Sequence, residues 1–169
     1  MFPRVLPEVY DVGKVLPIDF HINSDGSLCL GTEIEIRKRL VSKNKLKDWF
    51  EYCVKPFIFS SFYFKKYEVA IFGEEEHGTV GELDSLKRAL GLHSSKETCD
   101  FLKTLFSRRY RRKIYKKNSK INKYDCPCGS GKKFKECHRI KLEELDNIFE
   151  GKFMNYLQNL FVNYSREKK

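Results

Sequence analysis

The sequence lacks a continuous apolar segment long enough to cross a membrane. Its longest apolar stretch, residues 54–64, is interrupted by Lys55, Pro56, Ser60 and Ser61, whereas a membrane-spanning helix needs roughly 20 apolar residues. The first residues also lack the basic start and apolar run of a secretion signal. We therefore expect a soluble, cytoplasmic protein.

Acidic residues are scarce in the last two-fifths of the chain. The 169 residues carry 33 Lys+Arg and 23 Asp+Glu, a formal net charge of +10. Residues 1–100 hold 14 Lys+Arg and 16 Asp+Glu, whereas residues 101–169 hold 19 and 7. This asymmetry indicates two functional parts. The basic part is expected to meet an acidic partner, such as nucleic acid, the ribosome, an anionic lipid surface or an acidic protein face.

The segment from Arg108 to Lys120 contains no acidic residue. Eight of its 13 residues are Lys or Arg, and two tyrosines and an isoleucine lie between them. We predict that it belongs to a basic linker over residues 108–123. Two interpretations stay open, a solvated linker and a phosphate-binding patch for nucleic acid. No helix-turn-helix or RNA-recognition signature accompanies it.

Three of the six cysteines lie within twelve residues. Cys126, Cys128 and Cys137 belong to the run CPCGSGKKFKECH (126–138), which ends in His138. Zinc takes four sulfur or nitrogen ligands at tetrahedral corners, and the two glycines between the ligand pairs allow a tight turn. In a chain without a secretion signal, clustered cysteines indicate metal ligands more readily than disulfides.

This run resembles the SEC-C motif, a zinc-binding segment found at the C-terminal end of SecA translocation ATPases and attached to many unrelated bacterial proteins. The resemblance implies that Cys126, Cys128, Cys137 and His138 bind one structural Zn²⁺ with no open coordination position for catalysis. It also implies a docking module that meets protein partners, ribosomes or lipid. As an adaptor, such a module would recruit a ribosome, a chaperone or a translocase. Four nearby cations are expected to form a basic face: Lys132, Lys133, Lys135 and Arg139.

A second resemblance lies near the N-terminus. The segments FPRVLPEV (2–9) and HINSDGSLCL (21–30) resemble the YPFxPPxV strand and the active-site stretch of ubiquitin-conjugating enzymes. This implies an α+β fold with a small antiparallel sheet. It also implies that Cys29 carries a ubiquitin-like modifier as a thioester, received from an activating enzyme. His21 stands where the family places its oxyanion-stabilising asparagine, and Asn23 is the alternative donor.

The same resemblance implies that the domain is incomplete at its start. The family fold places a helix and two strands before the YPFxPPxV strand, whereas only Met1 precedes Phe2 here. We therefore expect an unpaired sheet edge, with reduced stability or a partner chain that covers the gap. Whether transferase activity survives is left open. The alternative for Cys29 is a small buried apolar residue on a strand.

Helical periodicity begins at Leu46. Apolar residues from there to Ile58 follow the i, i+3, i+4, i+7 spacing of one helical face, and Pro56 is expected to end or kink that helix. A shorter helix is expected to end at Gly91 as its left-handed C-cap. Ser94 is expected to cap the next helix.

These patterns divide the chain into four predicted parts. They are an incomplete ubiquitin-conjugating-like domain (1–107), a basic linker (108–123), the zinc motif (124–139) and one or two amphipathic helices (140–169). Three functions remain open: a ubiquitin-like-conjugating transferase with a zinc tail, a non-enzymatic zinc-dependent adaptor, and a basic nucleic-acid-binding protein.

Overall fold

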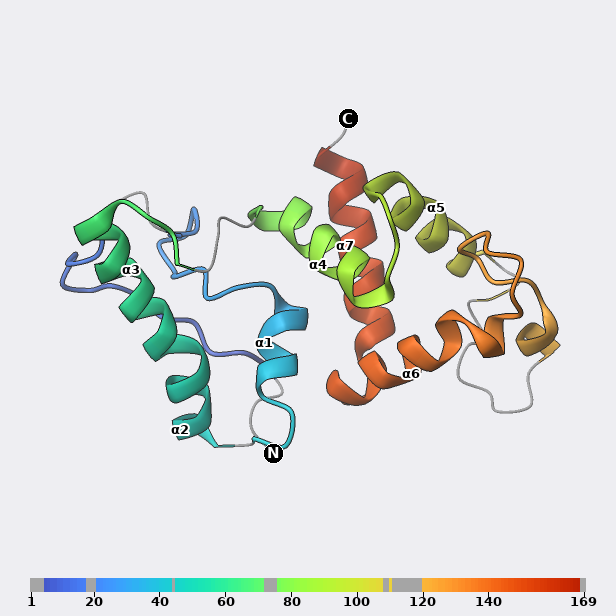
Figure 1. Ribbon diagram of the computed structural model, residues 1–169, viewed down its shortest axis with the longest axis horizontal. Helices are drawn as coiled ribbons and strands as arrows, with labels where there is room; N and C mark the ends of the chain where they lie inside the picture. The colour runs from blue at the N-terminus through green and yellow to red at the C-terminus, as the bar shows by residue number, and fades with distance from the viewer. Residues whose placement is uncertain are drawn as a thin grey trace. The chain divides into compact units, whose positions relative to one another are not determined.

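The periodicity that begins at Leu46 forms a continuous helical segment in the computed structural model, which describes residues 5–17, 21–43, 45–71, 76–107, 110 and 120–167 (Figure 1). The segment consists of α2 (Leu46–Trp49), a π-helical turn (Phe50–Val54) and α3 (Lys55–Tyr67). Of the two expectations for Pro56, an end of the helix there is wrong, because α3 continues to Tyr67. Proline lacks an N–H, and the wider π turn directly before it accommodates the disrupted hydrogen-bond ladder.

The chain forms two compact units, residues 1–75 and residues 76–169. In the first unit, α1 (Glu33–Arg39) begins at Thr32, whose hydroxyl accepts a hydrogen bond from the Glu35 N–H. Two small apolar clusters hold this unit together. One contains Ile36, Leu40, Trp49, Cys53 and Val54, and the other contains Leu16, Leu28 and Phe57.

The predicted antiparallel sheet, and with it the α+β fold class, is wrong. The described residues form helices and three isolated bridges, Tyr10↔Ser27, Ile22↔Leu28 and Asp125↔Lys133. Residues 5–17 are rich in valine, which favours strands, but Pro7 and Pro17 cannot donate to a ladder. The chain there makes single backbone contacts, such as Leu28 N–H to the Val9 carbonyl at 2.7 Å, and no continuous strand pairing.

The second unit is helical. It contains α4 (Gly78–Leu90), α5 (Ser95–Leu105), two 3₁₀ turns (Lys120–Lys123 and Phe134–Glu136), α6 (His138–Ile148) and α7 (Phe153–Glu167). Helix α4 packs against α5, α6 and α7 (Figure 1). The core of the second unit includes four phenylalanines that are almost fully buried: Phe101, Phe134, Phe149 and Phe153.

Two predicted helix ends are confirmed in this unit. Gly91 has φ = 71° directly after α4, the left-handed geometry that a residue without a Cβ adopts at low cost. The Ser94 hydroxyl accepts a hydrogen bond from the Glu97 N–H at 3.1 Å and caps α5. Gly151, with φ = 81°, lies in the short break between α6 and α7.

Most of the predicted basic linker, residues 108–109 and 111–119, lies outside the described residues, so its assignment as a linker stays a prediction. Within the described ranges, no helix is both long enough and apolar enough to span a membrane.

Candidate metal centre

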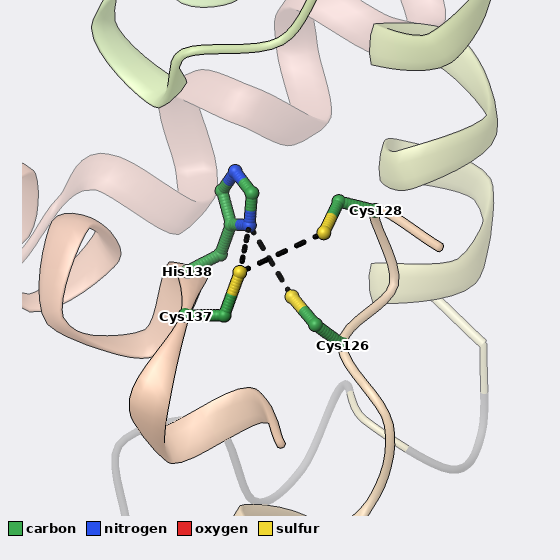
Figure 2. Close-up of side chains that lie close together, drawn as sticks. All are labelled: Cys126, Cys128, Cys137 and His138. Atoms are coloured by element: carbon green, nitrogen blue, oxygen red, sulfur yellow. Dashed lines mark hydrogen bonds between the residues drawn. The ribbon is translucent and has the colours of Figure 1, made fainter. Parts of the chain in front are cut away.

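Four side chains from the cysteine-rich segment converge on one point (Figure 2). The sulfurs of Cys126, Cys128 and Cys137 and a ring nitrogen of His138 all lie within 4.8 Å of one another. The His138 Nδ1 atom is 3.2 Å from the sulfur of Cys126 and 3.2 Å from that of Cys137. The sulfurs of Cys128 and Cys137 are 3.7 Å apart. The structure thus brings together all four residues that the sequence indicated as metal ligands.

The spacing of these atoms suits a tetrahedral zinc ion. With Zn–S near 2.3 Å and Zn–N near 2.0–2.1 Å, tetrahedral geometry separates two sulfurs by about 3.8 Å and sulfur from nitrogen by about 3.6 Å. The observed Cys128–Cys137 distance of 3.7 Å is close to that sulfur–sulfur edge. The two sulfur–nitrogen distances of 3.2 Å are a few tenths shorter. Three thiols and one imidazole are also a donor set that zinc commonly takes.

Backbone hydrogen bonds form the loop that carries the first two cysteines. The Cys126 N–H donates to the Lys132 carbonyl, and the Phe134 N–H donates to the Tyr124 carbonyl, each at 2.8 Å. Between these pairings, Gly129 and Gly131 have φ values of 76° and 72°. Only glycine adopts this backbone region without strain, so the two glycines permit the turn that returns the chain toward Cys137.

An aromatic cluster packs beside this loop. Phe134 is fully buried, and its ring lies edge-on to that of Tyr110 with 5.6 Å between centroids. The Tyr110 hydroxyl donates to the Asp125 carbonyl at 2.7 Å. The Tyr110 ring also meets Tyr124 edge-on at 6.2 Å. The loop is therefore anchored by apolar packing as well as by its four candidate ligands.

His138 links the candidate metal centre to α4 and α5. Its Nε2 atom lies 3.1 Å from the Leu90 carbonyl oxygen, at the end of α4. Because a carbonyl can only accept, Nε2 carries the proton, and in the neutral ring Nδ1 presents a lone pair to the cysteine sulfurs. The ring packs on Phe101 of α5, with 5.0 Å between centroids. Such an outer hydrogen bond fixes the tautomer and the orientation of a metal-binding histidine.

Sequence reasoning did not find the partners Leu90 and Phe101. Leu90 is 48 positions away from His138 along the chain, and its contribution is a main-chain carbonyl with no side-chain signature. The carbonyls in the last turn of a helix have no partner within the helix. The Leu90 carbonyl also accepts from the Lys141 ammonium. The predicted C-cap at Gly91 is the one sequence signal for this place, because it marks the end of α4, where carbonyls need partners from outside the helix.

The protonation of the candidate ligands differs from one to another in the metal-free chain. Burial raises the pKa of the Cys126 thiol to about 12. Burial also opposes ionisation of Cys128, but hydrogen bonds with the Ser130 hydroxyl and N–H outweigh it and lower the pKa of this thiol. For His138, burial and the nearby Lys141 charge lower the pKa, so that the ring stays neutral. A bound metal needs thiolates, so binding must release protons.

The basic face expected around the motif is largely neutralised by nearby carboxylates. Three of the four cations lie in ion pairs: Lys133 with Asp125 at 2.8 Å, Lys135 with Glu136 at 3.1 Å and Arg139 with Glu143 at 2.6 Å. The excess charge that distinguishes residues 101–169 therefore comes mainly from the basic segment, which lies mostly outside the described residues.

The residues predicted for transferase chemistry lie in the first unit. The ligand atoms of His21 and Cys29 are within 4.8 Å of each other, and the Cys29 N–H donates to the His21 carbonyl at 2.7 Å. Cys29 is partly buried. Asn23 lies in the intervening turn, where its Nδ2 atom donates to the Ser27 hydroxyl at 3.0 Å. The roles of these three residues in catalysis stay predictions.

Residues 125–139 match the family model of the SEC-C motif. The match covers both pairs of candidate ligands and the loop between them. No curated protein and no solved structure matches the chain. The resemblance to ubiquitin-conjugating enzymes has no support from these comparisons, and the sheet that it implied is not formed by the described residues.

Proposed function

We propose that this chain binds one structural Zn²⁺ through Cys126, Cys128, Cys137 and His138, and that residues 76–169 form a metal-stabilised docking module. The observation that carries the proposal is the convergence of four ligand atoms within 4.8 Å. The outer contacts add support, because the Leu90 carbonyl at 3.1 Å from His138 Nε2 leaves Nδ1 free to bind metal.

A complete set of four protein ligands favours a structural role over a catalytic one. Catalytic zinc sites keep one position open for water or substrate, whereas structural sites use four side chains. When bound, the ion supplies a cross-link and charge neutralisation for the thiolates. The residues of this chain would do the rest: Cys126 and Cys128 hold the loop, Cys137 and His138 hold the start of α6, and Leu90 orients the imidazole.

The proposal is tested by titrating the reduced, metal-free chain with zinc against a chromophoric chelator. We expect one equivalent to bind at pH 7.5, with an affinity at least tenfold weaker at pH 6.5. A protonated thiol with a pKa above the working pH contributes about a factor of ten per pH unit, and Cys126, with its raised pKa near 12, is such a thiol. The lowered pKa of His138 keeps the ring neutral, so it contributes little to this dependence.

The spectrum of the Co²⁺-loaded chain serves as an independent reading of the ligand set. Tetrahedral cobalt with three thiolates shows strong thiolate-to-metal absorption, and each Cys→Ser variant of the ligand set should reduce it. Less than one equivalent of bound zinc, or an affinity that does not change with pH, would contradict the four-ligand site.

A second candidate function is thiol chemistry at Cys29, favoured by the position of His21 beside it. A histidine near a thiol can accept its proton and so activate it as a nucleophile. In the transfer reaction predicted from the sequence, the Cys29 sulfur would accept an acyl group and pass it to an amine. The partners predicted from the sequence stay predictions. They are an activating enzyme with its modifier; a ribosome, chaperone or translocase; and nucleic acid.

Iodoacetamide labelling of the zinc-loaded protein near neutral pH tests the reactivity of Cys29. We expect Cys29 to react at least tenfold faster than Cys53, which is 1% exposed and whose thiol pKa is raised by burial. Mass spectrometry of tryptic peptides gives both rates from one sample. His21→Ala should slow labelling of Cys29 without changing that of Cys53. Equal rates at the two cysteines would argue that Cys29 is an ordinary apolar position.

A further inference from the structure

The outward face of α3 is aromatic, although its inward face is partly built of small residues. Ser60 and Ser61 are buried, at 8% and 0% exposure. Their neighbours Phe59 and Phe62 are 60% and 49% exposed. An amphipathic helix that packs once on its own unit shows the reverse arrangement, with aromatic residues inside and small polar residues outside. The pattern of α3 therefore points to a second packing surface on the outside of this helix.

The exposed residues, together with the half-buried Tyr63, form a continuous stripe along one side of the helix. Each residue of the stripe has another member three or four positions away, which places the two on one face of the helix. From the π turn to the end of α3, the stripe contains Tyr52, Lys55, Phe59, Phe62, Tyr63, Lys66 and Tyr67. Three of its rings are in contact in series, with 6.3 Å between the centroids of Phe59 and Tyr63 and 4.5 Å between those of Tyr63 and Tyr67. We call this set the aromatic stripe.

The aromatic stripe differs from the exposed apolar residues of the second unit. There, the described part of the chain exposes single large aliphatic residues, Val80, Ile140 and Val162, each on a different helix. Isolated residues of that kind are usual on a protein surface, whereas contiguous apolar patches mark interaction sites.

We propose that the aromatic stripe is a homodimer interface, in which two copies of the chain pack α3 against α3 in antiparallel orientation. A two-fold axis at Phe59 would place each Phe59 against its counterpart. Lys55 would then face Tyr63 of the second copy, and Lys66 would face Tyr52. Such an isologous contact lets one self-complementary patch cover itself.

Charge complementarity selects the antiparallel orientation. Glu51, which pairs with Lys55 at 3.0 Å, lies at one end of the stripe, and Lys66 lies at the other. In an antiparallel pair, Lys66 of each copy, whose ammonium lies 4.9 Å from the Tyr67 ring of its own chain, would approach Glu51 of the other copy. The Lys55 ammonium would lie near the Tyr63 ring of the other copy. A cation over such a ring is attracted by the ring quadrupole. Parallel helices would instead place Lys66 beside Lys66 and Glu51 beside Glu51.

The exposed area reaches the lower bound for a specific dimer interface. Tyr52, Phe59, Phe62 and Tyr67 are between 48% and 60% exposed. Since a large aromatic side chain can bury about 150–250 Å², four half-exposed rings offer roughly 400 Å² per copy. With Tyr63 and the lysine stems added, two copies would bury on the order of 1,000 Å², which is the lower bound for a specific interface.

Light scattering after size exclusion, in reductant and at several protein concentrations, tests this proposal on the full zinc-loaded chain. We expect a mass near 40 kDa, twice the 20.1 kDa of one chain, at micromolar concentrations. Phe59→Glu should weaken dimerisation at least a hundredfold, because it places two carboxylates at the two-fold axis. Phe59 is 60% exposed, so the variant should keep the helix content and melting temperature of the unmodified chain diluted to monomer.

Val12→Glu is the matched control, because Val12 is 91% exposed in the same unit and lies outside the stripe. It should remain dimeric. A charge-reversal pair tests the orientation: Glu51→Lys should weaken the dimer, and adding Lys66→Glu should restore it. A monomeric parent chain, or a dimer that survives Phe59→Glu, would overturn the interface. Failure of Lys66→Glu to rescue Glu51→Lys would overturn the antiparallel orientation. This inference is independent of the zinc proposal.

Discussion

Cys126→Ser should abolish stoichiometric zinc binding and lower the melting temperature of the second unit by roughly 12–32 °C. Cys126 is 4% exposed, and a serine hydroxyl there is a poor zinc ligand. At zinc concentrations of about 100–1,000 times the dissociation constant, binding stabilises the folded state by about 3–4 kcal/mol. For a unit of this size, each kcal/mol corresponds to about 4–8 °C. Calorimetry and metal analysis measure the two effects.

Cys99→Ser is the matched control, because Cys99 is a cysteine of the same unit that does not belong to the ligand cluster. It should bind one zinc ion and keep nearly the melting temperature of the parent chain. In excess chelator, the parent chain should melt close to Cys126→Ser, since both then lack the metal. A Cys126→Ser protein that still binds one equivalent of zinc would contradict the ligand assignment.

Phe101→Ala should destabilise the second unit by about 3–5 kcal/mol and weaken zinc binding at least tenfold. The first effect follows from the cavity left by a fully buried ring. The second follows from the contact between Phe101 and the His138 imidazole, 5.0 Å between centroids, which holds the ring against the Leu90 carbonyl. Loss of an outer contact to a metal ligand commonly costs 10–100-fold in metal affinity.

Leu102→Ala separates the two effects. Leu102 is also fully buried in α5, so its truncation should cost about 2–5 kcal/mol. Leu102 has no ring and so cannot make the ring contact that Phe101 makes with His138, and zinc affinity should stay within a few-fold of the parent value. Both variants are compared by chelator competition well below their melting temperatures. If both variants lost affinity equally, the Phe101–His138 contact would have no specific role in metal binding.

The elements that the sequence predicted correctly depend on short-range chemistry. The candidate ligands lie within thirteen residues, and a turn with two glycines is enough to bring them together. The cap at Ser94 and the end of α4 at Gly91 are likewise set by hydrogen bonds over three or four residues. Such features follow from local geometry whatever the surrounding fold.

The predicted sheet is wrong because a sheet does not follow from short-range chemistry alone. Valine-rich runs and the turn at residues 23–26 indicate extended chain, but a sheet also needs long-range pairing over several residues. The prolines at 7 and 17 limit that pairing, and the structure retains only isolated bridges. The resemblance to ubiquitin-conjugating enzymes rested on two short segments and so carried no information about the rest of the fold.

By itself, the sequence determined which four side chains form the candidate metal centre, because these residues are neighbours along the chain. Only the tertiary structure decided how that centre is supported. The partner of His138 is a main-chain carbonyl 48 residues away, and its ring packs on a different helix. The structure also decided that α3 turns its serines inward and its aromatic stripe outward. Periodicity identifies the faces of a helix, but the elements that surround the helix decide which face is buried. Contacts between residues far apart in the chain place those surrounding elements.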